Sequence, residues 1–293
     1  MSILVNKNTR VISQGITGRL GSVATERMID YGTKVVAGVT PGKGGTEIKG
    51  VPVYDTVREA VKYHPADASI TFVPPAFVKE AVFEALDVGI KFIVLAVERM
   101  PVKDMMIVYQ AIKHSDTVLL GPNSPGILTA EECSVGYLPG AVYRKGPVGI
   151  VSRSGTFSYQ VADDITKAGL GQTTALGIGG DPVTGVGFID ILKLFEKDPE
   201  TKVIVLIGEI GRTKEEEAAE YIQSEVSKPV VTIIAGRTAP AGKTMGHAGA
   251  IITAGRGTYE SKVKALERAG VPVARTSKEV ATLVKKALNK ESK

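Results

Sequence analysis

One histidine of this chain lies in a loop of small residues, Lys243-Thr244-Met245-Gly246-His247-Ala248-Gly249-Ala250. Imidazole is largely neutral near pH 7, so it is nucleophilic there without special tuning. Because glycine and alanine do not shield the ring, we interpret His247 as a candidate nucleophile; an ordinary loop histidine is the alternative that this stretch leaves open. The other two histidines, His64 and His114, have no glycine-rich loop beside them, and we expect both on the surface.

A carboxylate is predicted to orient this imidazole. Glu209, in Gly208-Glu209-Ile210-Gly211, directly follows the apolar run 203–207, which is typical of a buried strand. A carboxylate that accepts the N–H of one ring nitrogen fixes the tautomer and leaves the other nitrogen free to attack. The alternative for Glu209 is a solvated loop residue.

A first glycine loop, Gly15-Ile16-Thr17-Gly18-Arg19-Leu20-Gly21, leads from a predicted strand into a predicted helix. Glycines let backbone amides approach a phosphate, and the helix N-terminus adds a partial positive charge. A nicotinamide site would need an acidic residue about 20 positions further on. Thr40-Pro41-Gly42-Lys43 stands there instead. Lys43 would attract a ribose phosphate, so the loop predicts coenzyme A or NADP.

A second candidate anion site is Ser152-Arg153-Ser154-Gly155-Thr156. A serine nucleophile elbow would need glycine two residues before the serine, where Ser152 stands. We therefore expect Ser154, Gly155 and Thr156 to bind a phosphate at a helix N-terminus, with ordinary N-capping by Ser154 as the alternative. The stretch 236–244 does not fit a Walker A loop, so no site for splitting a nucleoside triphosphate is predicted.

The elements that must position these residues alternate between β-branched runs and helical patterns. Strands are predicted at 11–14, 34–39, 68–73, 92–96, 118–120, 148–151, 173–176, 203–207, 230–234 and 271–274. Helices are predicted at 22–31, 56–62, 76–88, 102–114, 156–167, 188–196, 214–225 and 278–288. This alternation predicts an α/β fold of two tandem, doubly wound parallel-sheet domains, whose ligands lie beyond the carboxyl ends of the strands.

The domain boundary is predicted where the alternation stops, at Gly121-Pro122-Asn123-Ser124-Pro125-Gly126. We assign residues 1–124 to the first domain and 125–293 to the second, with 125–146 as a linker. The chain has 43% hydrophobic residues, a net charge of +5 and a single cysteine, Cys133. No apolar run approaches the roughly 18 residues that span a bilayer. We expect a cytoplasmic protein that binds no metal, membrane or nucleic acid.

Seven motifs in order resemble the α subunits of succinyl-CoA synthetase, the succinate–CoA ligases that form ADP or GDP. They are Gly-Ile-Thr-Gly-Arg-Leu-Gly from position 15, Thr-Pro-Gly-Lys-Gly-Gly from 40, Gly-Pro-Asn from 121, Ile-Val-Ser-Arg-Ser-Gly-Thr from 150, Gly-Ile-Gly-Gly-Asp-Pro from 177, Ile-Gly-Glu-Ile-Gly from 207 and Met-Gly-His-Ala-Gly-Ala-Ile from 245. The resemblance covers nearly the whole chain. It implies a Rossmann-like CoA-binding domain followed by a flavodoxin-like ligase domain, and a tricarboxylic acid cycle enzyme.

The resemblance also implies residue roles. His247 would be phosphorylated during turnover and Glu209 would orient it, while Ser154, Gly155 and Thr156 would face the phosphoryl group. Tyr159 matches a substrate-contacting position shared with the partner chain. The residues implied to contact coenzyme A are Thr17, Gly18, Arg19, Leu20, Lys43, Ala96, Val97 and Glu98. Arg19 and Leu20 replace the more polar pair of some relatives, which puts side-chain contacts there in question.

The implied partner is an ATP-grasp β subunit that binds ATP or GTP with Mg²⁺, in an αβ heterodimer or heterotetramer. Two alternatives remain at this point. One is an NDP-forming acyl-CoA synthetase for another small acid such as acetate, and the other is a non-catalytic module that binds coenzyme A or NADP. The sequence does not determine the nucleotide preference, the range of acids or the favoured direction.

Overall fold

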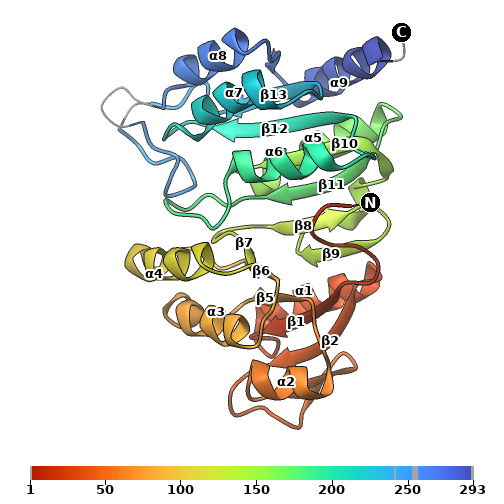
Figure 1. Ribbon diagram of the computed structural model, residues 1–293, viewed down its shortest axis with the longest axis vertical. Coiled ribbons are helices and arrows are strands. Elements are labelled where there is room, and N and C mark those ends of the chain that lie inside the picture. Colours follow the sequence, from red (N-terminus) through yellow and green to blue (C-terminus); the bar gives the residue numbers. More distant parts are fainter. Residues whose placement is uncertain (1, 241, 253–256, 292–293) are drawn as a thin grey trace.

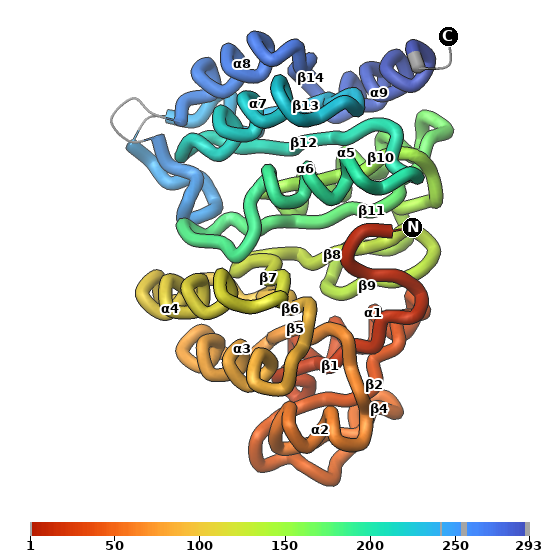
Figure 2. Tube along the Cα trace, in the orientation of Figure 1, coloured from red at the N-terminus to blue at the C-terminus, as the bar shows by residue number. Residues whose placement is uncertain are grey.

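The computed structural model describes residues 2–240, 242–252 and 257–291. Within them, helices and strands alternate along two seven-stranded sheets. Figure 1 shows the sheets one above the other, with the N-terminal half of the chain below and the C-terminal half above. The tube in Figure 2 shows the chain passing from the lower to the upper half at β7 and β8.

The first sheet has the strand order β3-β4-β2-β1-β5-β6-β7. Its strands are β1 (Arg10–Gln14), β2 (Lys34–Val39), β3 (Glu47–Ile48), β4 (Val51–Tyr54), β5 (Ala68–Thr71), β6 (Phe92–Leu95) and β7 (Val118–Leu120). All neighbouring pairs are parallel except β3 with β4. The parallel strands follow the Rossmann order 3-2-1-4-5-6, which confirms the Rossmann-like prediction. The helices are α1 (Arg19–Asp30), α2 (Val57–Tyr63), α3 (Val78–Asp87) and α4 (Val102–Lys113).

The second sheet has the order β14-β13-β12-β10-β11-β8-β9. Its strands are β8 (Gly126–Thr129), β9 (Cys133–Gly136), β10 (Lys145–Ser152), β11 (Gln172–Gly177), β12 (Val203–Glu209), β13 (Val230–Ala235) and β14 (Val273–Ala274). Its parallel strands follow the flavodoxin order 2-1-3-4-5, as predicted. The helices are α5 (Gly155–Lys167), α6 (Phe188–Lys197), α7 (Lys214–Glu225), α8 (Tyr259–Arg268) and α9 (Ser277–Glu291).

Several elements were not predicted. The segment 125–146, which we expected to be a linker, contributes β8 and β9 to the second sheet, and β8 pairs antiparallel with β11. These strands are only four residues long and are bounded by glycines, so their sequence carries little periodicity. β3 and β4 are equally short, and α8 has a strongly polar sequence, YESKVKALER. The predicted boundary at 124 falls between the end of β7 and the start of β8.

The central strands are buried on both faces, which explains their continuous apolar sequences. All residues of β6 (FIVL) and of β12 (VIVLIGE) are buried. One hydrophobic cluster joins residues of both sheets, including Val94, Leu120, Ile127 and Leu176. Ser124 Oγ also donates a hydrogen bond to the Gly177 carbonyl at 2.6 Å. The two sheets are therefore held against each other at the point where the chain crosses.

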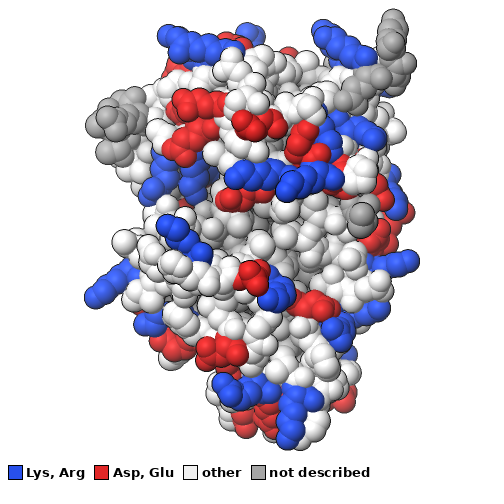
Figure 3. All heavy atoms as spheres, in the orientation of Figure 1, with Lys and Arg blue, Asp and Glu red and all other residues white. Residues whose placement is uncertain are grey.

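The outer surface carries charge of both signs. On the face drawn in Figure 3, Lys and Arg side chains are interspersed with Asp and Glu side chains. Among the described residues, no helix combines the length and the apolar composition that crossing a membrane requires.

Two neighbouring methionines on α4 allow a test of how this helix packs against the core. Met105 is 1% exposed, whereas Met106 is 57% exposed. Met105→Ala removes buried methylene groups and leaves a cavity, so we expect it to lower the free energy of unfolding by about 2–5 kcal/mol. Met106→Ala is the matched control and is expected to have almost no effect. Urea unfolding followed by circular dichroism measures both, and equal midpoints for the two variants would contradict the packing of α4.

Candidate active site

The loop after β13 brings His247 to the carboxyl edge of the second sheet. It is closed by main-chain hydrogen bonds from Met245 N to Ala250 O, at 2.9 Å, and from Ala250 N to His247 O, at 3.0 Å. A further bond, from Gly249 N to the carbonyl of Gly180 at 3.1 Å, ties the loop to the segment that follows β11. These bonds fix the backbone at His247, and 23% of its side chain is exposed.

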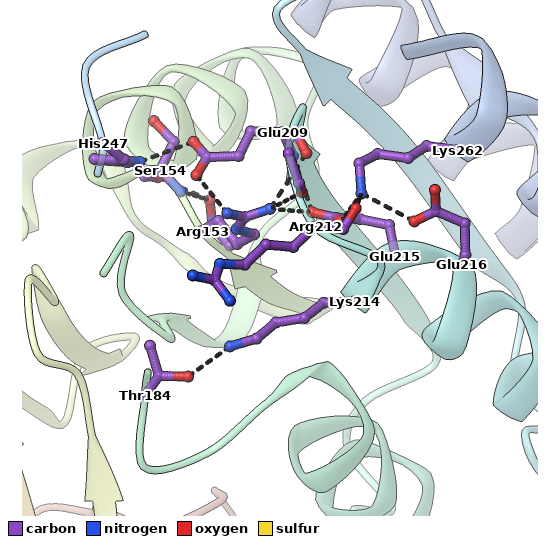
Figure 4. A network of polar contacts seen from close by, with 12 residues as sticks. Arg153, Ser154, Thr184, Glu209, Arg212, Lys214, Glu215, Glu216, His247 and Lys262 are labelled. Carbon is purple, nitrogen blue, oxygen red and sulfur yellow. Dashed lines mark hydrogen bonds and ion pairs between the residues drawn. The ribbon is translucent and has the colours of Figure 1, made fainter. Parts of the chain in front are cut away.

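The Nδ1 atom of His247 lies 2.8 Å from Oε2 of Glu209 (Figure 4). Glu209 is the last residue of β12 and is buried, so it is not the solvated loop residue that was the alternative. The hydrogen bond with Glu209 raises the pKa of His247 above its ordinary value, against the opposing effect of burial. This arrangement favours the tautomer with its proton on Nδ1, which leaves Nε2 as the nucleophilic atom.

Gly180 makes room for the imidazole. A Cβ atom on Gly180 would stand only 2.3 Å from Cγ of His247, which is closer than any real contact. From the sequence alone, the pair Gly179-Gly180, beyond the predicted strand 173–176, would be expected to bring backbone amides to this rim. In the structure the Gly180 carbonyl accepts from Gly249, and its missing side chain accommodates the ring.

His247 lines a cavity of about 570 Å³ between the two halves of the chain. Ser154, Gly155 and Thr156, at the N-terminus of α5, line the same cavity, as does Tyr159 one turn further on. Ser154 Oγ accepts from the Phe157 N–H at 3.3 Å, so the serine caps the helix and faces the cavity at once. The remaining lining residues are Arg27, Glu98, Asn123, Pro125, Tyr137, Leu138 and Pro139. The cavity can hold an anion between a helix N-terminus and a nucleophilic imidazole.

A second cavity, of about 710 Å³, lies at the carboxyl edge of the first sheet. Thr17 and Gly18 of the first glycine loop line it. The loop is fixed by Gly15 N donating to Val39 O at 2.7 Å. Gly21 is required for this turn, because a Cβ atom there would stand 2.2 Å from the Gly15 carbonyl oxygen. Most other lining residues are apolar or small: Val39, Thr40, Pro41, Phe72, Val73, Pro74, Phe77 and Ala81. This lining suits a flat aromatic ring system.

Comparisons with known proteins identify the domains in which these two cavities lie. Residues 6–98 match the CoA binding domain, and residues 151–272 match the CoA-ligase domain. The chain is 56% identical to the succinate–CoA ligase [ADP-forming] subunit alpha 2 of Archaeoglobus fulgidus, over 98% of this chain and 100% of that protein. It is 54% identical to the ADP-forming subunit alpha of Aquifex aeolicus, over 98% of this chain and 95% of that one. The chain belongs to the succinate–CoA ligase α-subunit family.

A solved structure extends the likeness beyond this α-subunit family. ATP citrate lyase from Methanothrix soehngenii, in complex with citrate and coenzyme A, superposes with a TM-score of 0.90 at 25% identity. The match covers 99% of this chain and 52% of that one. The CoA binding domain match contains the 710 Å³ cavity, and the CoA-ligase match contains both Glu209 and His247.

The residues that the family resemblance assigned to coenzyme A lie in four places. Thr17 and Gly18 line the larger cavity, whereas Arg19, Leu20 and Lys43 are exposed and outside its lining. Ala96 is buried and Val97 half-buried beyond the end of β6. Glu98 lies instead in the His247 cavity. The structure thus brings Glu98 of the first half together with His247 of the second.

Sequence reasoning did not assign a role to Arg153, which forms an ion pair with Glu209. An arginine between two serines directly after a strand was the available signal for Arg153. His64 is half-buried and bonds to the Tyr54 hydroxyl at 2.9 Å, while His114 is exposed at the end of α4. Among the described residues, no group of three or more His, Cys, Asp and Glu could hold a metal ion.

Gly180→Ala tests how tightly the imidazole is seated. The added methyl group would collide with the ring, so we expect His247 to move away from Glu209 and its pKa to fall toward the ordinary value. Nuclear magnetic resonance titration of ¹⁵N-histidine-labelled chain measures this shift. Gly187→Ala is the control, because its Cβ would meet only a side-chain atom at 3.8 Å. An unchanged His247 titration in Gly180→Ala would contradict the close packing of Gly180 against the imidazole ring.

Proposed function

We propose that this chain, together with a β subunit, converts succinate, coenzyme A and a nucleoside triphosphate reversibly into succinyl-CoA, nucleoside diphosphate and phosphate by way of phosphorylated His247. The observation that carries the proposal is the 2.8 Å contact between Glu209 and Nδ1 of a histidine that lines a cavity with a helix N-terminus. The names of the 56% and 54% identical relatives support succinate as the acid and ADP as the product.

The hydrogen bond to Glu209 prepares His247 for phosphorylation, because it leaves the lone pair of Nε2 free to attack. The lone pair of Nε2 forms a bond to the γ-phosphorus, while the bond between that phosphorus and the bridging oxygen breaks and the electron pair leaves with the diphosphate. The proton on Nδ1 stays in place, so the ring acquires positive charge. The ionised Glu209 stabilises that charge. Backbone N–H groups at the start of α5 would hold the phosphoryl oxygens during the transfer.

The second half of the reaction forms the thioester. A succinate carboxylate oxygen attacks the phosphorus and the bond to Nε2 breaks, which gives succinyl phosphate and restores the neutral imidazole. The thiolate sulfur of coenzyme A then attacks the acyl carbon, and phosphate leaves. A covalent intermediate divides one difficult transfer into easier steps. Tyr159, which lines the His247 cavity, is the residue of this chain that we assign to contact the acid.

Coenzyme A is proposed to lie with its adenine ring in the 710 Å³ cavity and its thiol directed toward Glu98 and His247. Thr17 and Gly18 would contact the adenine nucleotide, with Arg19, Leu20 and Lys43 at the exposed rim near its phosphates. Ala96 and Val97 lie along the edge of the first sheet between the two cavities. The match to the CoA binding domain supports this half of the proposal.

The nucleotide and Mg²⁺ are assigned to the β subunit. The described part of this chain has no cluster of metal ligands, and its sequence contains no Walker A loop. The relatives are named as α subunits, which supports a partner chain. Mg²⁺ would neutralise charge on the transferring phosphoryl group.

His247→Asn tests the covalent step. It removes the nucleophilic Nε2, so we expect no acid-labile phosphate and no measurable ligase turnover in complex with a β subunit. Coenzyme A affinity, measured by calorimetry, is expected to remain within about twofold, because His247 is outside the larger cavity. His114→Asn, at an exposed position on α4, is the control. Retained turnover in His247→Asn would refute the catalytic role of His247. Turnover of the unsubstituted complex with acetate but not with succinate would mean that acetate is the acid substrate.

The pH dependence of phosphorylation follows from the pKa of His247. Only the neutral ring attacks, and Glu209 raises the folded pKa of His247 above its ordinary value. Phosphorylation is therefore expected to fall as pH drops through a midpoint that lies higher than that of an ordinary histidine. In Glu209→Gln the midpoint is expected to move to lower pH, while the plateau rate falls by about 10²-fold because the orienting charge is lost. Rapid-quench assays of the complex measure both, and an identical profile for the two proteins would contradict the pairing.

A further inference from the structure

Glu209 is itself held by a row of buried charges that reaches away from His247 (Figure 4). Its Oε1 lies 3.0 Å from Nη2 of Arg153. Nη1 of Arg153 donates to Oε1 of Glu215 at 3.1 Å. Glu215 in turn accepts from Lys262, and Lys262 also pairs with Glu216 at 2.9 Å. Negative and positive groups thus alternate from β12 through the β10–α5 loop to α7 and α8.

The three central side chains of this row are almost completely buried. The side chains of Arg153, Glu215 and Lys262 are 2%, 0% and 0% exposed. Buried charges are retained only where they are paired, because water cannot solvate them. Burial alone would raise the pKa of Glu215, but the charges of Arg153 and Lys262 outweigh it and hold that pKa below the ordinary value. Glu215 is therefore held as a carboxylate between two cations.

Arg153 contacts both the side chain and the backbone of Glu209. Its Nη1 donates to the Glu209 carbonyl at 3.3 Å and to the Gly211 carbonyl at 3.1 Å. The Glu209 N–H donates to Oε1 of Glu215 at 3.1 Å. The contact between Nη2 and Oε1 of Glu209 is an ion pair and not an aligned hydrogen bond, so it acts chiefly through charge. Only a planar guanidinium reaches this many acceptors in fixed directions.

We propose that Arg153, held by the buried pair Glu215–Lys262, is a positioning residue that keeps the Glu209 carboxylate aimed at Nδ1 of His247. This inference rests on the proposed phosphorylation of His247. Without the guanidinium, Glu209 would lose its ion-pair partner and the donor that holds its backbone carbonyl, so its carboxylate would no longer be held toward Nδ1. The row contains three carboxylates and two cations, so it has one net negative charge, which offsets the positive charge that develops on the ring.

Removing either side of the Arg153–Glu215 pair is expected to change the titration of His247. The hydrogen bond with Glu209 is the largest cause of the raised His247 pKa, so Arg153→Gln, which releases that carboxylate, is expected to lower the His247 pKa toward its ordinary value even though a nearby positive charge is removed. Glu215→Gln keeps an oxygen acceptor but leaves Arg153 less neutralised, so the His247 pKa is expected to fall. Arg153→Lys retains the charge but not the planar fork of donors, so it is expected to restore the titration only in part.

Other groups that face His247 are constant across these variants. Glu98, beyond β6, raises the His247 pKa, and Asp181, after β11, interacts with the ring through its charge. Arg27 of α1 lines the same cavity. None of them contacts Arg153 or Glu215 among the described hydrogen bonds and ion pairs. Differences between variants therefore report on the buried row.

The experiment is a ¹⁵N-histidine titration of the full-length chain without the β subunit, with His64 and His114 as internal references. The variants are Arg153→Gln, Arg153→Lys and Glu215→Gln, with Glu220→Gln as the matched carboxylate-to-amide control at an exposed position of α7 outside the row. We expect a lower His247 pKa in Arg153→Gln and in Glu215→Gln, a proton on Nδ1 in the unsubstituted chain, and no shift in Glu220→Gln. A higher His247 pKa in Arg153→Gln would overturn the proposal, because it would mean that the guanidinium acts on the ring only as a charge. Phosphorylation of the complex at pH 7 is expected to slow at least tenfold in Arg153→Gln.

Unchanged titration and tautomer of His247 in folded Arg153→Gln and Glu215→Gln would overturn the proposal, even if phosphorylation slowed, because slowing without a shift indicates a structural role. Should Arg153→Gln fail to fold, Glu215→Gln decides alone, since its amide oxygen can still accept from Arg153 and from the Glu209 N–H. The titration requires no phosphoryl transfer. Absence of phosphate on His247 of the unsubstituted complex would therefore refute the proposed function without affecting this test.

Discussion

The buried carboxylate of Glu209 is the constraint on which the rest of this site depends. One of its oxygens faces a guanidinium and the other faces an imidazole, at 3.0 and 2.8 Å. A carboxylate with almost no access to water remains ionised only if its neighbours supply positive charge and hydrogen-bond donors. That requirement explains why Arg153, Glu215 and Lys262 are buried beside Glu209. The imidazole also needs space next to this carboxylate, and the absence of a side chain at Gly180 provides it.

Parallel-sheet topology explains why these groups meet. The ends of β10, β11 and β12 carry Ser152-Arg153-Ser154, Gly179-Gly180 and Glu209, and all three strands end at the same edge of one sheet. Antiparallel neighbours would have sent alternate loops to opposite edges. The first sheet adds Glu98 to the cavity from beyond β6, because the sheets share a hydrophobic cluster at their junction. The cavity around His247 is thus formed by both halves of the chain.

The two cavities differ in chemistry as well as position. The larger is lined chiefly by apolar and small residues and a glycine turn, which suits an adenine nucleotide. The smaller carries an imidazole, a helix N-terminus, Arg27 and Glu98, which suits a transferring anion. The reaction that we propose would use both environments. One chain with two sheets in contact provides both of them.

The sequence alone determined the type and order of most elements, because burial on both faces of a central strand requires a continuous apolar run and an amphipathic helix requires its own period. Four strands escaped because two to four residues carry too little periodicity, and α8 escaped because most of its residues are polar. The motifs also identified Glu209 and His247 individually. Only the tertiary structure decided their 2.8 Å contact across 38 positions and the Arg153 contact across 56, because such proximity depends on strand order and loop path, which no local pattern records.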